Sequence, residues 1–403
     1  MDSLLGRISF IALAMAASSS AIAADAPTSI RIGYAISLSG VNAQGAATTT
    51  LPGYDLWVKD VNDKGGIMVK EFGKRIPVEV VAKYDDTSNA ETLLRLEEKL
   101  MTQDKVDFVL PPWSTGFNLA VAPIFAKYGY PQLAVTANAN DEEQLVKQFP
   151  TLFFFLNQPM HFGAALIGVL DTLKGAGKIN NKVVLLSVGD QFGAEFAAGF
   201  GAGLKGSGYD VVLQKSYPLG AADLTNEIKE AKSSGADTFI AGSYPPDTFM
   251  LAGTSITQGY NPKVYYTAVG TAFAEFGGAF KGKADGVFGI GGWDPNLPGA
   301  QDYYKRQVAL TGHAPDGWAS PVTYASLQIL EQAIEKAGTL DRAKVLDAIT
   351  NGGPWDTISG PIDLKTHIRE KQWGVGQWQN GQFVGVSPSD MTGAQPVIPK
   401  PAW

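Results

Sequence analysis

The sequence predicts an α/β protein of two lobes, each built around a parallel sheet with helices on both faces. Three observations favour this fold. Short apolar segments of strand type alternate with longer amphipathic segments of helix type. The alternation restarts after Phe153-Phe154-Phe155, so two series of similar length follow one another. The chain of 403 residues is also long for a single core, since domains usually hold about 100–200 residues.

The first series has the composition of buried strands separated by helices. Strands are expected at Ile30–Ala35, Val78–Val81, Phe108–Leu110 and Gln132–Val135, with helices through Tyr54–Val58 and at Ala90–Gln103. The second series repeats the pattern. A helix is expected near Ala164 to Lys174, and strands at Val183–Ser187, Val211–Leu213, Thr238–Ala241 and Val264–Tyr266. The Pro- and Gly-rich segment from Ser387 to Trp403 is expected to wrap a surface.

The N-terminus has the pattern of a cleavable signal peptide. Arg7 supplies the positive charge, a short apolar run follows, and Ala21-Ile22-Ala23 gives the small-x-small cleavage pattern. The apolar run is shorter than the about 20 residues that span a bilayer. Residues 1–23 are therefore expected to be removed on export to the periplasm, and no Cys follows the cleavage site to carry a lipid anchor.

Composition and charge argue against several classes of function. The net charge of −7, with acidic residues spread along the chain, opposes binding to nucleic acid or insertion at an anionic membrane. The absence of Cys excludes thiol chemistry, and the three His residues have no metal-ligand spacing. We therefore expect no metal, no cofactor and no catalytic residues.

Two glycine-rich segments imitate nucleotide-binding motifs. Gly201–Gly206 has the GxGxxG spelling, but it ends a predicted helix instead of following a strand. Gly277–Lys283 nearly spells a phosphate loop, but Ala284 stands where a Ser or Thr would bind magnesium. Packing glycines and a helix end explain both segments better.

An ordered series of short motifs carries a family resemblance. The motifs are Ile32–Gly40, Val61–Ile67, Tyr84-Asp85-Asp86, Trp113–Gly116, Ala122-Pro123, Gly189–Gly193, Thr323–Leu327 and Ser359–Ile362. With these, the chain resembles the type I periplasmic solute-binding proteins of the branched-chain amino acid class, whose archetype is the leucine/isoleucine/valine-binding protein.

The resemblance implies two Rossmann-like lobes joined by three crossover strands, closing over a ligand by a hinge motion. On the family pattern, the crossovers are expected near Phe153–Leu156, Val287–Gly291 and Thr357–Pro361. Lobe one would combine residues 24–152 with 291–357, and lobe two would combine residues 153–290 with 358–403. The implied function is the periplasmic substrate-binding component of an ABC importer.

The resemblance also implies a ligand site in the cleft. In the family, hydroxyls and backbone N–H groups of lobe one hold the ligand carboxylate, and the matching positions are Ser114, Thr115, Ala134 and Thr136. Ser114 and Thr136 could instead cap helices. Lobe two of the amino-acid binders supplies two Tyr and a Glu, and the Glu binds the ligand's ammonium. The corresponding positions here are Phe192, Tyr244 and Val269. Asp247 or Glu275 could supply the missing charge from a neighbouring loop.

Aromatic residues gather in the predicted cleft loops. Trp113, Phe192 and Tyr244 are joined there by His161 and Trp293, and aromatic pockets favour flat apolar ligands. The expected ligand is a small aromatic or otherwise hydrophobic carboxylate. A branched-chain or other aliphatic amino acid and an amide remain alternatives.

The expected partners are the small-molecule carboxylate and the ABC permease subunits of the inner membrane. We expect no nucleic acid, no direct membrane insertion and a monomer. A periplasmic ligand-sensing module is a weaker alternative, and an exported enzyme is weaker still.

Overall fold

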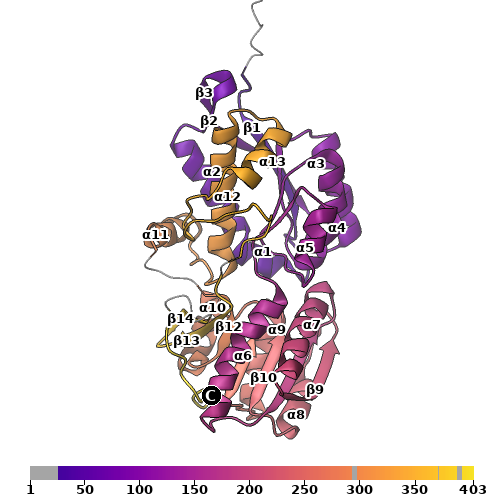
Figure 1. The fold of residues 1–403 in the computed structure, drawn as a ribbon, viewed down its shortest axis with the longest axis vertical. Helices are drawn as coiled ribbons and strands as arrows, with labels where there is room; N and C mark the ends of the chain where they lie inside the picture. Colours follow the sequence, from indigo (N-terminus) through magenta and orange to yellow (C-terminus); the bar gives the residue numbers. More distant parts are fainter. Residues whose placement is uncertain (1–25, 293–296, 371, 388–392) are drawn as a thin grey trace, which may run out of the picture.

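The computed structural model describes residues 26–292, 297–370, 372–387 and 393–403. The expected signal peptide (1–23) and Trp293 lie outside these ranges. The described chain forms two α/β bodies stacked along the long axis of the molecule (Figure 1). We call the body that contains β1 lobe one and the body that contains β8 lobe two.

Lobe one holds the first series of elements and three later helices. Its elements are β1 (Ile30–Ile36), α1 (Ala43–Thr49), α2 (Leu51–Asp63), β2 (Ile67–Val69), the 3-10 turn η1 (Lys70–Phe72), β3 (Lys74–Ile76), β4 (Val78–Asp85), α3 (Ala90–Thr102), β5 (Phe108–Leu110), α4 (Thr115–Tyr128), β6 (Gln132–Ala134), α5 (Glu142–Gln148), β7 (Leu152–Phe154), α11 (Ala300–Thr311), α12 (Ala319–Ala337) and α13 (Arg342–Asn351).

Lobe two holds the second series and the C-terminal strands. Its elements are α6 (Pro159–Gly175), β8 (Lys182–Val188), α7 (Gln191–Gly206), β9 (Asp210–Tyr217), α8 (Thr225–Ser233), β10 (Thr238–Gly242), α9 (Pro245–Thr257), β11 (Val264–Thr267), α10 (Ala274–Phe280), the 3-10 turn η2 (Lys281–Ala284), β12 (Phe288–Ile290), β13 (Val375–Gln379) and β14 (Gln382–Ser387).

The strands pair as the alternation predicts. In lobe one, β4, β1 and β5 form a parallel sheet in that order, and β6 pairs in parallel with β7. In lobe two, seven strands form the order β14-β13-β12-β11-β10-β8-β9. The five strands from β12 to β9 in this order are parallel, whereas β13 and β14 pair antiparallel. The alternation did not predict β13 and β14.

Local sequence explains the elements that carry the site. Six of the seven residues of β1 are buried, as expected for a strand covered on both faces. Helix α3 begins after Asn89, whose side chain accepts a hydrogen bond from the Thr92 N–H at 2.9 Å. Its Leu93, Leu96 and Leu100 are buried at helical spacing. The GxGxxG segment is the last turn of α7, so it follows no strand.

The chain passes between the lobes three times. The first passage follows β7, and the second follows β12. The expected third passage at Thr357–Pro361 stays a prediction. Near it, Trp355 and Ile362 pair with each other, and Ile368 bridges Phe154. Val375 pairs with Ile290 in the lobe-two sheet.

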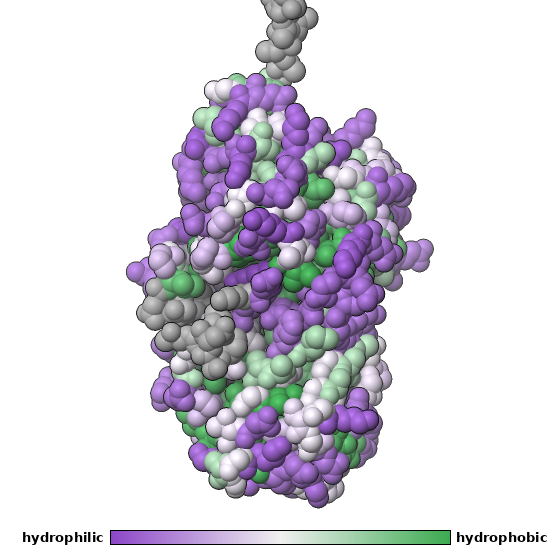
Figure 2. All heavy atoms as spheres, viewed as in Figure 1, coloured by the Kyte–Doolittle hydropathy of each residue, from purple (hydrophilic) through white to green (hydrophobic). Residues whose placement is uncertain are grey.

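The lobes touch each other across the cleft. Helices α4 and α7 lie in contact, as do α1 and α9. At the rim, a Cβ built on Gly220 would lie 3.2 Å from Cγ1 of Val41, so loops of the two lobes meet there. On the face shown in Figure 2, hydrophilic residues cover most of lobe one, and more apolar residues show on lobe two. The structure is that of a closed two-lobed molecule.

Candidate functional site

A cavity lies between the lobes at the ends of the strands. The residues that line it come from both bodies and are Thr49, Trp113, Ser114, Thr115, Thr136, Asn138, Leu156, Phe192, Tyr244, Val269, Trp318 and Ala319. None of these twelve is more than 9% exposed. The cavity is thus lined by buried residues, and none of its lining side chains carries a formal charge.

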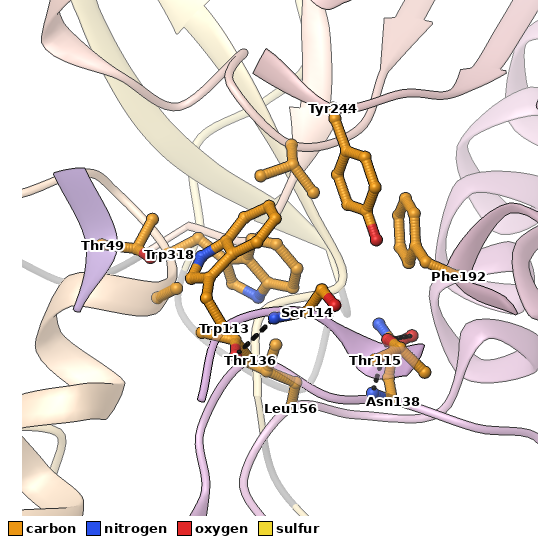
Figure 3. A pocket seen from close by; sticks show the side chains of 12 residues that line it. Thr49, Trp113, Ser114, Thr115, Thr136, Asn138, Leu156, Phe192, Tyr244 and Trp318 are labelled. Carbon is orange, nitrogen blue, oxygen red and sulfur yellow. Dashed lines mark hydrogen bonds between the residues drawn. The ribbon is translucent and has the colours of Figure 1, made fainter. Parts of the chain in front are cut away.

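Polar groups of lobe one form one wall of the cavity. The Ser114 N–H donates to Oγ1 of Thr136 at 3.2 Å, and the Asn138 N–H donates to Oγ1 of Thr115 at 3.3 Å (Figure 3). The Ser114 hydroxyl also caps α4, because it accepts a hydrogen bond from the Phe117 N–H at 3.3 Å. A helix offers its first N–H groups no internal acceptor. The start of α4 therefore presents hydroxyls and N–H groups together.

The backbone of Ser114 has an unusual conformation. Its φ is 88° and its ψ is 154°, a region that is essentially restricted to Gly and costs about 1–3 kcal/mol for other residues. Neighbouring contacts hold it there: Asn118 Nδ2 donates to the Ser114 carbonyl and to the Pro112 carbonyl, each at 2.9 Å. The strained residue lies on the cavity wall, where such strain is commonly functional.

Aromatic rings form the facing wall. The rings of Trp113 and Tyr244 lie 5.1 Å apart between centroids, and Tyr244 stacks on Phe192 at 5.1 Å with an interplanar angle of 20°. Figure 3 shows Tyr244 beside Phe192, with its hydroxyl pointing toward Ser114. The Trp113 Nε1–H donates to Oγ1 of Thr49 at 2.9 Å. A Cβ at Gly45 would lie 2.1 Å from the indole of Trp113, so only Gly lets the ring lie on α1.

Tyr244 links the two walls. Its hydroxyl donates to Oδ2 of Asp190 at 2.8 Å, and its oxygen lies within hydrogen-bonding reach of the Ser114 side chain. Asp190 in turn caps α7, accepting from the Gly193 N–H at 2.9 Å. Burial raises the pKa of Asp190 above its ordinary value. The Tyr244 phenol is thus one of the contacts between the two lobes.

Val269, which the resemblance predicts at the position of the ammonium partner, is an apolar residue of the cavity wall. Val269 is 5% exposed and lines the cavity. Asp247 is buried beneath the start of α9, where burial raises its pKa to about 6, and it does not line the cavity. Glu275 lies on α10, 3.9 Å from Nδ1 of the exposed His313. Neither acid takes the place of the missing Glu.

The cavity brings together most of the residues expected from the sequence. Those that line it are Trp113, Ser114, Thr115, Thr136, Phe192, Tyr244 and Val269. Ala134 is buried at the end of β6 without lining the cavity. His161 is exposed on α6, with Nδ1 at 2.6 Å from Oδ1 of Asn157, and it also lies outside the lining.

Several lining residues were missed in the sequence. They are Thr49, Asn138, Leu156, Trp318 and Ala319. Thr49 ends α1, and Trp318 and Ala319 lie at the start of α12, so the rule that ligands bind beyond strand ends does not point to them. A large aromatic residue next to a Gly at a predicted helix start is the sequence pattern that could have indicated Trp318 as a lining residue.

The Trp318 indole is an unpartnered donor. Its residue is 5% exposed, and its buried Nε1–H has no hydrogen-bond partner in the described structure. Leaving a buried donor unpaired costs about 1–3 kcal/mol. A ligand acceptor in the cavity would remove this cost.

Metal clusters and membrane-spanning helices can be assessed only in the described ranges. There, no cluster of three or more His, Asp or Glu side chains is arranged to hold a metal ion. Within the same ranges, no helix is both long and apolar enough to cross a membrane.

Comparisons with known proteins agree with the two-lobed fold and its cleft. The model of the family described as "Periplasmic binding protein" matches residues 29–382. The Leu/Ile/Val-binding protein homolog 7 of Brucella abortus (strain 2308) is 23% identical, over 94% of this chain and 96% of the relative.

Two solved structures share the fold. The substrate-binding protein LivJ of Streptococcus pneumoniae, solved with isoleucine, has a TM-score of 0.76 at 20% identity and covers 89% of this chain and all of its own. A solute-binding protein of R. palustris, solved with benzoate, has a TM-score of 0.75 at 18% identity, covering 93% of this chain and 97% of its own. The family model spans most of the chain, and the protein therefore belongs to the type I periplasmic binding proteins of the branched-chain amino acid class.

Proposed function

We propose that this protein is the substrate-binding component of an ABC importer and that it captures a small aromatic carboxylate between its lobes. The observation that carries the proposal is the composition of the cavity wall. Four aromatic rings, from Trp113, Phe192, Tyr244 and Trp318, surround a cavity whose polar groups are hydroxyls, an amide and N–H donors.

The carboxylate of the ligand would lie at the start of α4. Ser114 and Thr115 offer hydroxyls there, and the N-terminal N–H groups of the helix carry partial positive charge. Charge-assisted hydrogen bonds to a carboxylate are stronger than bonds between neutral groups. Such a site holds an anion without a lysine or arginine.

The cavity is unfavourable for the ammonium of an amino acid. A buried charge without a partner costs several kcal/mol, and Val269 offers that ammonium no acceptor side chain. The benzoate complex of the R. palustris relative shows that a protein of this fold can hold an aromatic acid. The LivJ complex with isoleucine makes the amino acid the competing hypothesis.

The wider setting follows the family. We propose that residues 1–23 direct export to the periplasm and are removed, and that the closed form is recognised by the permease. We further propose that lobe one combines residues 24–152 with about 291–368, and that lobe two combines 153–290 with the rest. The lobes would then close about the three passages as a hinge.

Substitutions at Val269 test the proposed chemistry. Val269→Glu places a carboxylate on the wall that faces the ligand, and we expect it to weaken benzoate binding at least tenfold at pH 7. Val269→Gln has a similar size without the charge, so we expect it to weaken benzoate binding less. Calorimetric titration with benzoate and with leucine measures both affinities for each variant.

Equal loss of benzoate affinity in the two variants would show that size alone matters at this position. Tight leucine binding by the unaltered protein would reject the aromatic acid.

A further inference from the structure

A second cavity lies on the hinge side of the ligand site. Its walls come from the start of α12 and from the second and third passages between the lobes, including Gly292, Trp318, Ser359, Arg369, Gln372 and Trp373. Trp318 lines both cavities, so its indole separates them. The second cavity thus lies where the lobes must pivot.

Arg369 gives this cavity an unusual charge. Its Nη1 atom is buried and has no hydrogen-bond partner in the described structure. Burial lowers the pKa of the guanidinium to about 10, and no carboxylate in the described ranges counteracts that effect. The arginine remains charged at neutral pH and is half-buried as a residue, while its buried Nη1 donor is left without an acceptor, which costs about 1–3 kcal/mol.

The backbone fixes Arg369 in place. Its N–H donates to the Phe154 carbonyl at 3.0 Å, and the Phe154 N–H donates to the His367 carbonyl at 2.8 Å. Next along the passage, Gln372 Nε2 donates to the Phe155 carbonyl. The backbone at Arg369 is therefore bonded to the first passage, and the half-buried side chain also lines a more open pocket formed by residues 361–370.

From these observations we propose that the Arg369 cavity is a second ligand subsite, which takes an oxyanion of the carboxylate class. A planar guanidinium matches a carboxylate through paired hydrogen bonds, and the cavity offers Ser359 and Gln372 as further polar groups. The oxyanion is either a second acidic group of the cleft ligand, reaching past Trp318, or a free small anion. In both cases it binds against two of the hinge passages.

The inference rests on the proposed function, because it assumes that the lobes close about a hinge. It does not depend on which ligand occupies the first cavity. The experiment titrates benzoate, terephthalate and acetate into the unaltered protein and Arg369→Met, with chloride matching the ionic strength. Benzoate reports on the aromatic cavity. Terephthalate tests a second carboxylate on the same ligand, and acetate tests a free anion. Arg95→Met removes an exposed arginine of α3 and is the matched control.

We expect Arg369→Met to bind terephthalate or acetate about 10- to 100-fold more weakly than the unaltered protein, the size of a lost charged hydrogen bond. Arg95→Met should keep the unaltered affinities. We also expect ligand-free Arg369→Met to have a higher melting temperature, because the variant removes a buried Nη1 donor that has no acceptor. Should Arg369→Met fail to fold, Arg369→Lys keeps the charge without the planar fork and should still weaken the anion.

The subsite is overturned if neither terephthalate nor acetate distinguishes the Arg369 variants from the unaltered protein. Arg369→Met could instead lose benzoate binding and keep its affinities for terephthalate and acetate. That result would contradict the proposed function, since benzoate has no second carboxylate. The two failures are therefore separate results.

Discussion

Ser114 combines a strained backbone with a ligand-facing hydroxyl, and these two features can be separated by substitution. Gly tolerates the observed φ of 88° and ψ of 154°, whereas Ala does not. Relief of about 1–3 kcal/mol of strain exceeds the entropy cost of Gly, about 0.5–1 kcal/mol, and the small loss of the cap.

We therefore expect Ser114→Gly to be more stable than the unaltered protein by about 1 kcal/mol, and Ser114→Ala to be less stable by about 1 kcal/mol. Both should bind benzoate more weakly, because both lack the hydroxyl. Urea unfolding measures the stabilities, and calorimetry measures the affinities. If Gly proves no more stable than Ala, the backbone at Ser114 is not strained.

Glu142 gives the fold a pH dependence of known sign. Its side chain is fully buried, and its Oε2 has no hydrogen-bond partner in the described structure. Burial raises its pKa from 4.5 to about 9, with smaller contributions from Glu143, Asp141 and Glu195. A pKa raised by folding means that the stability is fully present below the unfolded pKa and is lost as pH rises toward the folded one.

We expect the unaltered protein to lose stability between pH 5 and pH 8, and Glu142→Gln to lose less, because Gln imitates the protonated acid. The control is Glu91→Gln on the exposed face of α3. Denaturant unfolding at the two pH values measures the difference. The same pH dependence in Glu142→Gln as in the unaltered protein would assign the effect to other groups.

The cavity-lining residues that the sequence predicted share one property: they follow strands. Trp113 to Thr115 follow β5, Thr136 follows β6, and Tyr244 and Val269 follow β10 and β11. Local sequence could not predict Trp318, because the contact of α12 with the cleft depends on the packing of distant helices. It also could not show that His161 turns outward from α6.

Helix α7 and the loop before α5 form a hydrogen-bonded contact between the lobes. Asn140 of lobe one donates from its N–H to Oε2 of Glu195 at 2.9 Å. Its Nδ2 also donates at 2.8 Å both to that oxygen and to the Glu195 carbonyl. The side-chain oxygen Oδ1 of Asn140 accepts a hydrogen bond from the Met160 N–H of lobe two at 3.0 Å. Under the proposed hinge motion, these bonds would favour the form in which the lobes are in contact.

We expect Glu195→Ala to weaken benzoate binding severalfold, about 1 kcal/mol, because it removes bonds that favour the closed form without touching the ligand. Glu230→Ala, on the exposed face of α8 in the same lobe, is the control and should leave the affinity unchanged. Calorimetry measures both affinities. An unchanged affinity in Glu195→Ala would show that this contact does not favour closure.

Strand prediction worked best where apolar runs are buried between helices. The runs at β8 and β10 were predicted to within one residue at each end, since both strands are covered on both faces. The strands β13 and β14 carry Gly, Gln and a turn, and they form by antiparallel pairing at the edge of the sheet. The bridge between Ile368 and Phe154 joins segments that are remote in sequence, so local patterns could not predict it.

At the scale of the whole molecule, the candidate site is built by both lobes. Its twelve cavity residues come from both lobes and are nearly inaccessible in this structure. Under the proposed function, a ligand would enter an open form and stabilise the closed one. The bridge from Ser114 through Tyr244 to Asp190 couples the ligand wall of lobe one to helix α7 of lobe two.

The most direct test of the proposed ligand class is a thermal-shift screen of the protein from residue 24 onward, freed of bound ligand by unfolding and refolding. The panel holds aromatic acids, aliphatic amino acids and neutral amides. We expect benzoate- or cinnamate-like acids to raise the melting temperature, since a ligand at about 100 times its Kd stabilises the native state by about 2.7 kcal/mol. Leucine and valine should have no effect. A shift with leucine or valine and none with the aromatic acids would contradict the proposed ligand.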